Sequence, residues 1–241
     1  YIFGGNGTII SARVMIGCPV RERGWILPRY LKCLTDLDYP AGQIEYAFVV
    51  NDSQDDTLEI LQEFARNAQS PVEIRQVNLK SRTSPVRGAH SIGNLVVLRN
   101  ILLDMFLIST ATHLFSLDSD ILAEPDSLAR LIDLDLPVVS MLVPNDRHLE
   151  TKGYYNIANL QGDQYLPIMK FPRDQVIPVD CTGAGYLIRR EVIEAVGVRY
   201  YPHRQGEDAG FCRVARARGV GLWCHTGIRA AHIMVREGKC Q

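Results

Sequence analysis

The chain has 241 residues, of which 46% are hydrophobic and 22% are charged, a balance typical of a soluble globular protein. Its 26 Lys and Arg residues against 27 Asp and Glu residues give a formal net charge of -1, so no overall positive field favours nucleic acid or an anionic membrane. No apolar run approaches the roughly 18 residues of a membrane-spanning helix. We therefore expect one domain over residues 1–241, with no nucleic-acid partner and no integral membrane segment in this chain.

Six cysteines are scattered along the chain without a C-x-x-C pair, which argues against a zinc knot or a redox dithiol. Cys18, Cys181 and Cys212 lie in apolar or tightly turning segments, where free cysteine behaves as a small core residue. This favours a reducing compartment and a cytoplasmic location, with peripheral membrane association as the alternative. The chain begins at Tyr1 without a Met, so a targeting or anchoring segment outside this sequence stays open.

The first half alternates strand and helix patterns. Apolar runs predict strands at residues 12–17, 44–50, 72–77 and 113–117, and helical spacing predicts helices at 25–34, 56–68 and 95–108. Ser53 and Asp56 resemble a capping box at the start of the second helix. This order predicts an α/β fold with a central, mainly parallel sheet flanked by helices, and a ligand site at the carboxyl ends of the strands.

The second half is less regular. We expect a strand at residues 138–143, a long loop or hairpin region at 153–174, and a strand passing into a helix at 186–195. A last helix at 209–218 ends before Gly219, its expected C-cap. No repeat or change of composition marks a linker between domains.

Asp118-Ser119-Asp120 ends an apolar strand. Carboxylates on alternate residues of an extended chain point the same way, and such oxygen ligands suit Mg²⁺ or Mn²⁺, which bridge a diphosphate. Two other Asp-x-Asp matches, at 36–38 and 133–135, lie at ordinary helix ends. Only Asp118 and Asp120 terminate a strand in the interior of the sheet, where carboxylates need a partner. The alternative interpretation is a turn whose acids cap the next helix.

Asp52 ends another strand in the same manner. A carboxylate there suits hydrogen bonds from a nucleobase, although Asx residues also favour turns and N-caps without any ligand. If the two strands are neighbours, Asp52 and Asp118 line one crevice.

Glu207 and Asp208 precede the last helix. An acid at that position is either an N-cap facing the helix dipole or a general base projecting into the cleft. His232 has an apolar context and is either a core residue or a metal ligand. His225 is a weaker candidate for the same metal.

Together these segments resemble the GT-A fold of family 2 glycosyltransferases over most of the chain. The matching segments are the first strand and nucleotide-binding loop at 14–21, the "NDSxDxT" turn within 37–57, the "RN…DSD" arrangement of 98–100 with 118–120, the glycine-containing acceptor-side strand at 182–192, and the "ED" motif at 206–208. Residues 37–57 also resemble the yeast mannan-polymerase family, which uses GDP-mannose. The chain departs from the common pattern at Asp56, where glycine is frequent. It also lacks the Q-x-x-R-W motif of processive members, which argues against a membrane-bound polysaccharide synthase.

The resemblance implies roles for particular residues. It assigns the nucleotide sugar to Pro19, Val20, Arg21, Asp52, Arg87, Arg99, Asp118, Ser119 and Gly183. Asp120 and His232 would hold a divalent metal, Mn²⁺ or Mg²⁺. Asp208 would be the general base, and Glu207 would help to position the acceptor. Residues 1–122 would form the nucleotide-sugar half and residues 123–241 the acceptor half.

The function so implied is transfer of a sugar from a UDP- or GDP-linked donor to a hydroxyl of a glycan, protein or small-molecule acceptor. Inversion is expected, with retention open. One alternative is a nucleotidyltransferase, which usually has a glycine-rich phosphate loop that residues 17–21 do not match. The other is an inactive GT-A-fold binding or scaffold protein, against which the intact pair of Asp120 and Asp208 counts.

Overall fold

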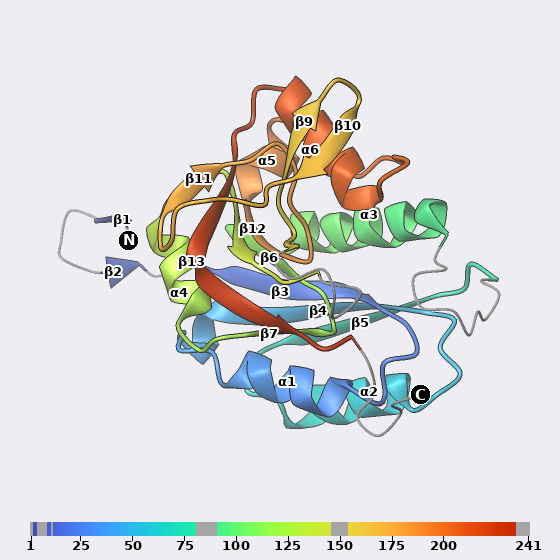
Figure 1. Ribbon diagram of the computed structural model, residues 1–241. Coiled ribbons are helices and arrows are strands. Elements are labelled where there is room, and N and C mark those ends of the chain that lie inside the picture. The colour runs from blue at the N-terminus through green and yellow to red at the C-terminus, as the bar shows by residue number, and fades with distance from the viewer. Residues whose placement is uncertain (1, 4–8, 11, 81–90, 146–153, 235–241) are drawn as a thin grey trace.

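The computed structural model describes residues 2–3, 9–10, 12–80, 91–145 and 154–234 (Figure 1). Among them are thirteen strands: β1 Ile2–Phe3, β2 Ile9–Ile10, β3 Val14–Val20, β4 Ile44–Asn51, β5 Val72–Val77, β6 His113–Leu117, β7 Ile121–Ala123, β8 Val138–Leu142, β9 Ala158–Gln161, β10 Gln164–Pro167, β11 Val176–Pro178, β12 Gly185–Arg189 and β13 Leu222–His232. The helices in the same part of the chain are α1 Leu27–Thr35, α2 Thr57–Asn67, α3 Ile92–Ile108, α4 Ser127–Asp133, α5 Arg190–Glu194 and α6 Glu207–Ala217, with a short 3₁₀ turn at Ala41–Gln43.

One large sheet organises the fold. Its strands follow the order β11-β13-β8-β12-β6-β3-β4-β5, and β7 also pairs with β13. The run β6-β3-β4-β5 is parallel, as is the β8–β13 pair. β12 runs antiparallel to both of its neighbours, β6 and β8. The expected α/β architecture is therefore present, with a parallel first half and an antiparallel strand that the sequence pattern does not reveal.

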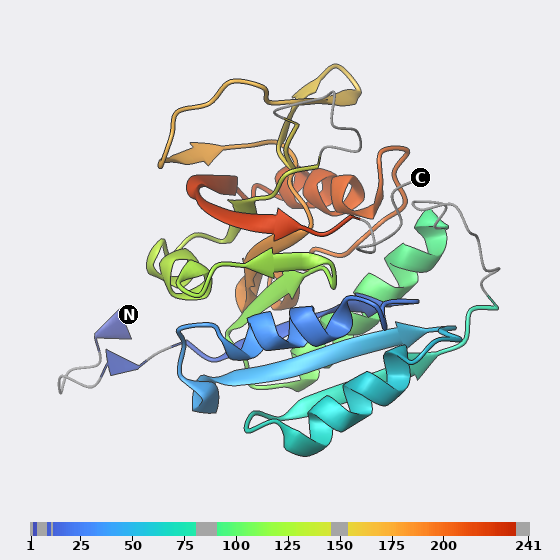
Figure 2. The ribbon, with the colours of Figure 1, turned by 60° about the horizontal axis from the view of Figure 1, so that its bottom comes forward.

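The two faces of the sheet carry separate apolar cores. Within β3, Val14, Ile16, Cys18 and Val20 belong to one core and Met15 to the other, as the alternation of a strand requires. Helices α1, α2 and α4 cover the first face, and α3, α5 and α6 cover the second (Figures 1 and 2). A Cβ on Gly17 would lie 2.3 Å from the carbonyl oxygen of Ala47, so glycine is needed for the close contact between β3 and β4.

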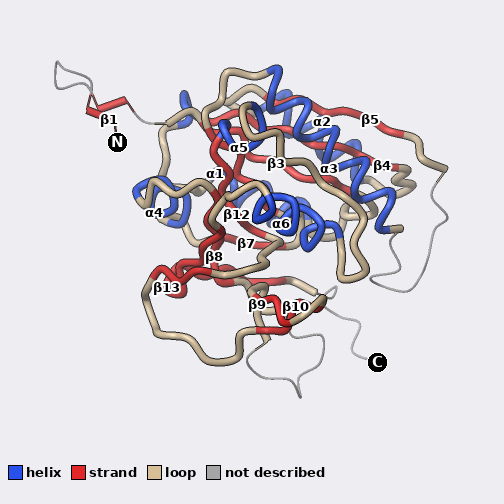
Figure 3. Tube along the Cα trace, turned by 90° about the horizontal axis from the view of Figure 1, so that it is seen from above, coloured by secondary structure: helices blue, strands red, loops and turns tan. Residues whose placement is uncertain are grey.

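The second half places a hairpin beside the end of the sheet. Strands β9 and β10 pair antiparallel, in the 153–174 region where a loop or hairpin is expected. Viewed from above, this hairpin lies on the opposite side of the molecule from β5 (Figure 3). A bridge between Ala158 and Cys181 joins it to the segment that precedes β12.

One local expectation is wrong, and one condition left open by the sequence is not met. The capping box at α2 does not form, because Asp56 makes no side-chain cap bond and the hydroxyl of Ser53 instead accepts from the backbone amide of Glu22. The strands that end at Asp52 and Asp118 are not neighbours either, because β3 lies between β4 and β6. Asp52 and Asp118 still follow strands of the parallel run, but they are separated by the loop after β3.

Of the helices in the described residues, none is long and apolar enough to cross a membrane. In the same residues Cys18, Cys33, Cys181, Cys212 and Cys224 are free thiols.

Candidate functional site

The loop after β3 is held by the loop after β4. Three consecutive backbone amides donate to three side chains of the second loop: Glu22 to Ser53 Oγ at 3.1 Å, Arg23 to Thr57 Oγ1 at 2.8 Å and Gly24 to Asp55 Oδ2 at 2.9 Å. The "NDSxDxT" turn therefore fixes the backbone of the loop after β3. That loop carries Arg21 and Arg23.

The two carboxylates of the Asp-Ser-Asp tripeptide have different partners. Asp118 Oδ1 accepts a hydrogen bond of 2.7 Å from Nη2 of Arg99, whose side chain is only 4% exposed. Asp120 Oδ2 lies 3.3 Å from Nη2 of Arg23, and its Oδ1 lies 3.8 Å from Nε2 of His232. Asp118 is thus paired with a buried arginine, whereas Asp120 lies beside an arginine and a histidine.

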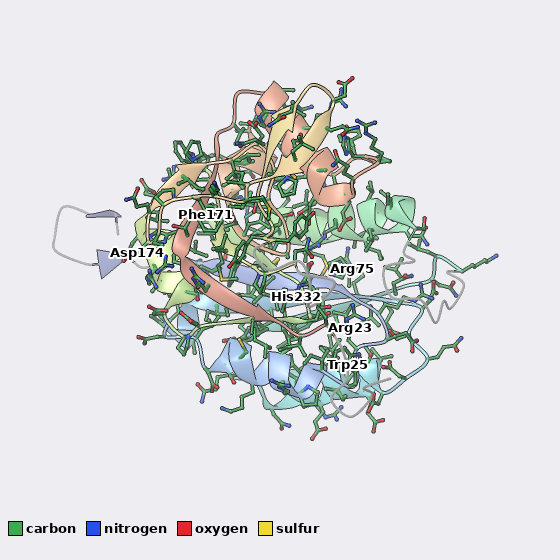
Figure 4. The ribbon with its side chains drawn as sticks, viewed as in Figure 1. Arg23, Trp25, Arg75, Phe171, Asp174 and His232 are labelled. Carbon is green, nitrogen blue, oxygen red and sulfur yellow. The ribbon has the colours of Figure 1, made fainter. Side chains whose placement is uncertain are left out.

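His232 is held by a hydrogen bond at one nitrogen of its ring. Its Nδ1 lies 2.9 Å from the carbonyl oxygen of Pro144, and a carbonyl can only accept, so Nδ1 carries the hydrogen. The other nitrogen, Nε2, faces Asp120. The backbone amide of Ile233 donates to the carbonyl of Asp120 at 2.8 Å, which ties the end of β13 to this turn. Figure 4 shows Arg23 and His232 at the same end of the sheet.

The donors around Asp120 suit a metal bound together with its ligand. Among the described residues, no group of three or more His, Cys, Asp or Glu side chains is arranged to hold a metal ion. Asp120 and His232 supply two donors. Mg²⁺ and similar ions at phosphates take one or two carboxylates from the protein and complete their coordination with phosphate and water oxygens. The residues present therefore fit a divalent ion that binds with a diphosphate.

Asp208 lies in the first turn of α6, whose N-cap is Gly206 with a φ of 109°. Burial, reinforced by the negative charges of Glu207 and Asp118, raises the pKa of Asp208 to about 7, although Arg99 and the hydroxyl of Tyr186 act in the opposite direction. The side chain remains 24% exposed. A carboxylate that titrates near neutral pH is suited to general-base catalysis.

A cavity of about 310 Å³ reaches Asp208 and His232 but is not lined by Asp120. It is lined by four of the residues expected from the sequence: Asp118, Gly183, Asp208 and His232. Its lining also includes aromatic and amide side chains from the second half of the chain: Tyr154, Tyr155, Asn156, Tyr165 and Gln205. A Cβ on Gly183 would lie 2.2 Å from Asp208 Oδ2, so glycine at this position leaves room for the carboxylate.

The remaining expected site residues lie around this centre. Pro19 and Arg21 are half-buried at the end of β3, whereas the side chains of Val20 and Ser119 are buried. Asp52 has a φ of 47°, and its Oδ2 accepts from the side chain of Asn51 at 2.9 Å and from the amide of Leu79 at 3.2 Å. It therefore links the ends of β4 and β5.

Three other residues that the sequence singled out are Glu207, Arg87 and His225. Glu207 is not one of the residues that line the cavity, and its Oε1 lies 3.4 Å from Nη2 of Arg99. Arg87 lies outside the described residues. His225 is in the middle of β13 opposite Val176, where its ring accepts from the amide of Gly227, so it does not join the site.

The other two Asp-x-Asp pairs take no part in the site. Asp36 is the C-cap of α1 and pairs with Lys32 on an exposed surface. Asp135 pairs with Arg189, which lies opposite His113 at the amino end of β6.

Sequence reasoning missed Arg23, Ser116 and Tyr200. Arg23 lies two residues after Arg21 in the same loop. This closeness to an expected site residue was the only sequence feature that indicated Arg23. Tyr200 lies in a segment without strand or helix periodicity, and Ser116 is a fully buried hydroxyl within β6. Their importance depends on neighbours from distant parts of the chain.

The family model described as Anp1 matches residues 6–166. The chain belongs to the Anp1 family. This agrees with the resemblance of residues 37–57 to the mannan-polymerase family, while membership of family 2 is not established. Procollagen galactosyltransferase 1-A of Xenopus laevis is 27% identical over 213 residues, covering 82% of this chain and 34% of that protein. The chain thus spans about a third of the length of this curated relative.

Solved structures share the fold. A mannosyltransferase from Pyrobaculum calidifontis, PcManGT in complex with GDP-Man and Mn²⁺, has a TM-score of 0.63 at 17% identity and covers 95% of this chain and 59% of its own. GalNAc-T7 with UDP, GalNAc and Mn²⁺ has a TM-score of 0.67 at 15% identity and covers 96% of this chain and 46% of its own. The expected GT-A fold is confirmed by these likenesses.

Proposed function

We propose that the protein is a metal-dependent glycosyltransferase that moves a sugar from a UDP- or GDP-linked donor to an acceptor hydroxyl with inversion. The observation that carries the proposal is the position of Asp208. This carboxylate has a pKa near neutrality and lines the same cavity as Asp118 and His232. The Anp1 family match and the glycosyltransferases among the similar proteins support this activity.

The nucleotide would bind at the carboxyl ends of β3, β4 and β6. We assign the nucleoside and its ribose to Pro19, Val20, Arg21, Asp52, Arg99, Asp118 and Ser119, with Gly183 beside the transferred sugar. Asp120 and His232 would hold a Mn²⁺ or Mg²⁺ ion on the diphosphate, and the ion would stabilise the negative charge that develops on the leaving group. Arg23, next to Asp120, would place a further positive charge beside the same phosphates.

The chemistry at Asp208 follows from the weak nucleophilicity of a hydroxyl at neutral pH. The acceptor oxygen forms a bond to the anomeric carbon as the bond to the diphosphate oxygen breaks, and the diphosphate leaves with the electron pair. Asp208 takes the proton of the attacking hydroxyl, which keeps positive charge from building on that oxygen. Because Gly183 has no side chain, Asp208 Oδ2 has room beside the cavity.

The acceptor would approach from the wall formed by the second half of the chain. Tyrosine rings and side-chain amides suit a glycan, a glycosylated protein or a small hydroxyl compound. On this basis residues 1–122 form the donor half and 123–241 the acceptor half of one domain. The free thiols support the proposal of a reducing, cytoplasmic compartment.

A thermal-shift screen of UDP, GDP, CMP and their sugar conjugates, each with Mn²⁺ or with EDTA, tests the proposal. A ligand at 100 times its dissociation constant stabilises a protein by about 2.7 kcal/mol, enough to raise the melting temperature by a few degrees. We expect a metal-dependent shift with one nucleotide class, and release of that nucleoside diphosphate from its sugar conjugate. The absence of a shift with every nucleotide would reject the proposal in favour of an inactive scaffold.

A further inference from the structure

A chain of buried hydroxyl groups connects Arg99 to Asp208. Arg99 Nη1 donates to Ser116 Oγ at 3.1 Å, and the Ser116 hydroxyl acts on the phenol of Tyr200 to lower its pKa, against the larger effect of burial. The hydroxyls of Tyr200 and Tyr186 bond to each other. Tyr186 then donates to Asp208 Oδ1 at 3.0 Å. These residues come from α3, β6, β12, α6 and the segment before α6.

The chain is well shielded from solvent. Ser116 and Tyr186 have no exposed surface, Tyr200 is 2% exposed and Arg99 is 3% exposed. A buried hydroxyl without a partner is costly, so this arrangement persists only if each group is satisfied by the next. The ring of Tyr200 also stacks near the guanidinium of Arg99, with its centroid 5.8 Å from Cζ. The network is therefore buried, and Arg99 contacts it at the Tyr200 ring as well as through Ser116.

The direction of the hydrogen bonds follows from the chemistry of the two ends. A guanidinium can only donate and an ionised carboxylate can only accept, while each hydroxyl has a single hydrogen. When Asp208 is ionised, every hydroxyl in the chain satisfies its neighbours by donating towards Asp208. A chain of this kind polarises each bond in the same sense, and it stabilises the ionised carboxylate.

We infer that Tyr186, supported by Tyr200 and Ser116, is a positioning residue that holds the Asp208 carboxylate and favours its ionised form. Tyr186 fixes Oδ1, and Gly183 leaves room for Oδ2 on the side of the cavity. The proposed glycosyl transfer assigns no role to these hydroxyls. The catalytic part of this inference rests on that proposed function. The physical claim, that the Tyr186 hydrogen bond lowers the pKa of Asp208 against the effect of burial, stands independently of the reaction.

The test is a carboxyl ¹³C NMR titration of aspartate-labelled protein, with the Asp208 resonance assigned by its loss in Asp208→Asn. Tyr186→Phe removes one hydroxyl and keeps the ring. We expect it to raise the pKa of Asp208 by about one pH unit. Tyr200→Phe should raise it less and Ser116→Ala least, because their effect passes through more bonds. Tyr46→Phe is the matched control, since its buried hydroxyl bonds to the carbonyl of Leu34.

An unchanged Asp208 titration in folded Tyr186→Phe would overturn the inference. If that variant does not fold, an unchanged titration in both Tyr200→Phe and Ser116→Ala would do the same. Donor turnover supplies the catalytic readout: in Tyr186→Phe, kcat should fall about tenfold with little change in KM. The acidic limb of its pH–rate profile should move to higher pH.

These readouts separate two failures. If the wild-type protein turns over no nucleotide sugar, the proposed function fails while the NMR titration still decides the role of Tyr186. If the wild type is active and the titration shifts in Tyr186→Phe without a matching shift in the pH–rate profile, Asp208 is not the base, and the catalytic part of the inference is overturned.

Discussion

The two sides of the candidate site are held by different kinds of contact. On the donor side, the loop after β3 is fixed by backbone amides that donate to Ser53, Asp55 and Thr57, which lie within five residues of one another. On the base side, Asp208 is fixed by the buried chain from Arg99 through three hydroxyls drawn from distant segments. The contacts on the donor side join residues of two loops, whereas those on the base side join segments that are far apart in the chain.

The largest expected effect is the loss of turnover, without loss of nucleotide binding, when Asp208 is replaced. Asp208→Asn keeps the shape of the side chain and removes the proton acceptor, so we expect kcat to fall by about a thousandfold. Nucleotide binding measured by calorimetry should be unchanged, because the donor side is intact. Asp104→Asn is the matched control, because Asp104 lies on α3 in an exposed ion pair with Arg199. Equal loss of binding and turnover in Asp208→Asn would show that the two sides are not independent.

Asp120→Ala should affect both binding and turnover. We expect the Mn²⁺-dependent part of nucleotide binding to disappear and kcat to fall about a hundredfold, because one of two protein ligands is lost. Calorimetry with and without EDTA measures the first effect and donor turnover the second. Asp36→Ala, in the Asp-x-Asp pair on the exposed end of α1, is the control. Full turnover in Asp120→Ala would reject the metal assignment.

Arg23→Gln tests whether this arginine contributes to diphosphate binding on the donor side. Its guanidinium lies 3.3 Å from Asp120, so its loss should weaken binding of a nucleoside diphosphate about tenfold. The affinity for Mn²⁺ alone should not fall, because a competing positive charge is removed. Calorimetric titration with each ligand measures the two effects. Arg75→Gln, in an exposed ion pair with Glu73 on β5 (Figure 4), should change neither value.

The smallest expected effect is the pH dependence of stability. The pKa of Asp208 is raised from 3.8 to about 7 in the folded protein, so the folded state binds this proton more tightly than the unfolded state. The free energy of unfolding should therefore decrease as pH rises from about 4 to about 7. Asp208→Asn should remove that part of the slope and be more stable than the wild type by about 1 to 2 kcal/mol at pH 8. Urea denaturation at several pH values measures the difference, and a parallel decline in both proteins would contradict it.

Most elements of the parallel half were predictable from the sequence, because the residue pattern that indicates each element lies within its own segment. Alternating or continuous apolar runs identified β3, β4, β5 and β6, and helical spacing identified α1, α2 and α3. The Asp118–Asp120 tripeptide stood out for the same reason, since charged residues at the end of a buried strand need partners. The antiparallel direction of β12 was not predictable, because a strand's own residues do not specify which neighbour it will join.

What the sequence by itself determined is the set of elements and the carboxylates that follow them, because strand and helix periods, turn residues and buried charges are local properties. The partners of those carboxylates were decided only by the tertiary structure. Arg99 reaches Asp118 across 19 residues and Glu207 across 108, and Tyr186 meets Asp208 only because β12 and α6 pack together. Burial shifts the pKa of Asp208 for the same reason: the low-polarity surroundings that favour its neutral form are assembled from segments that are far apart in the chain.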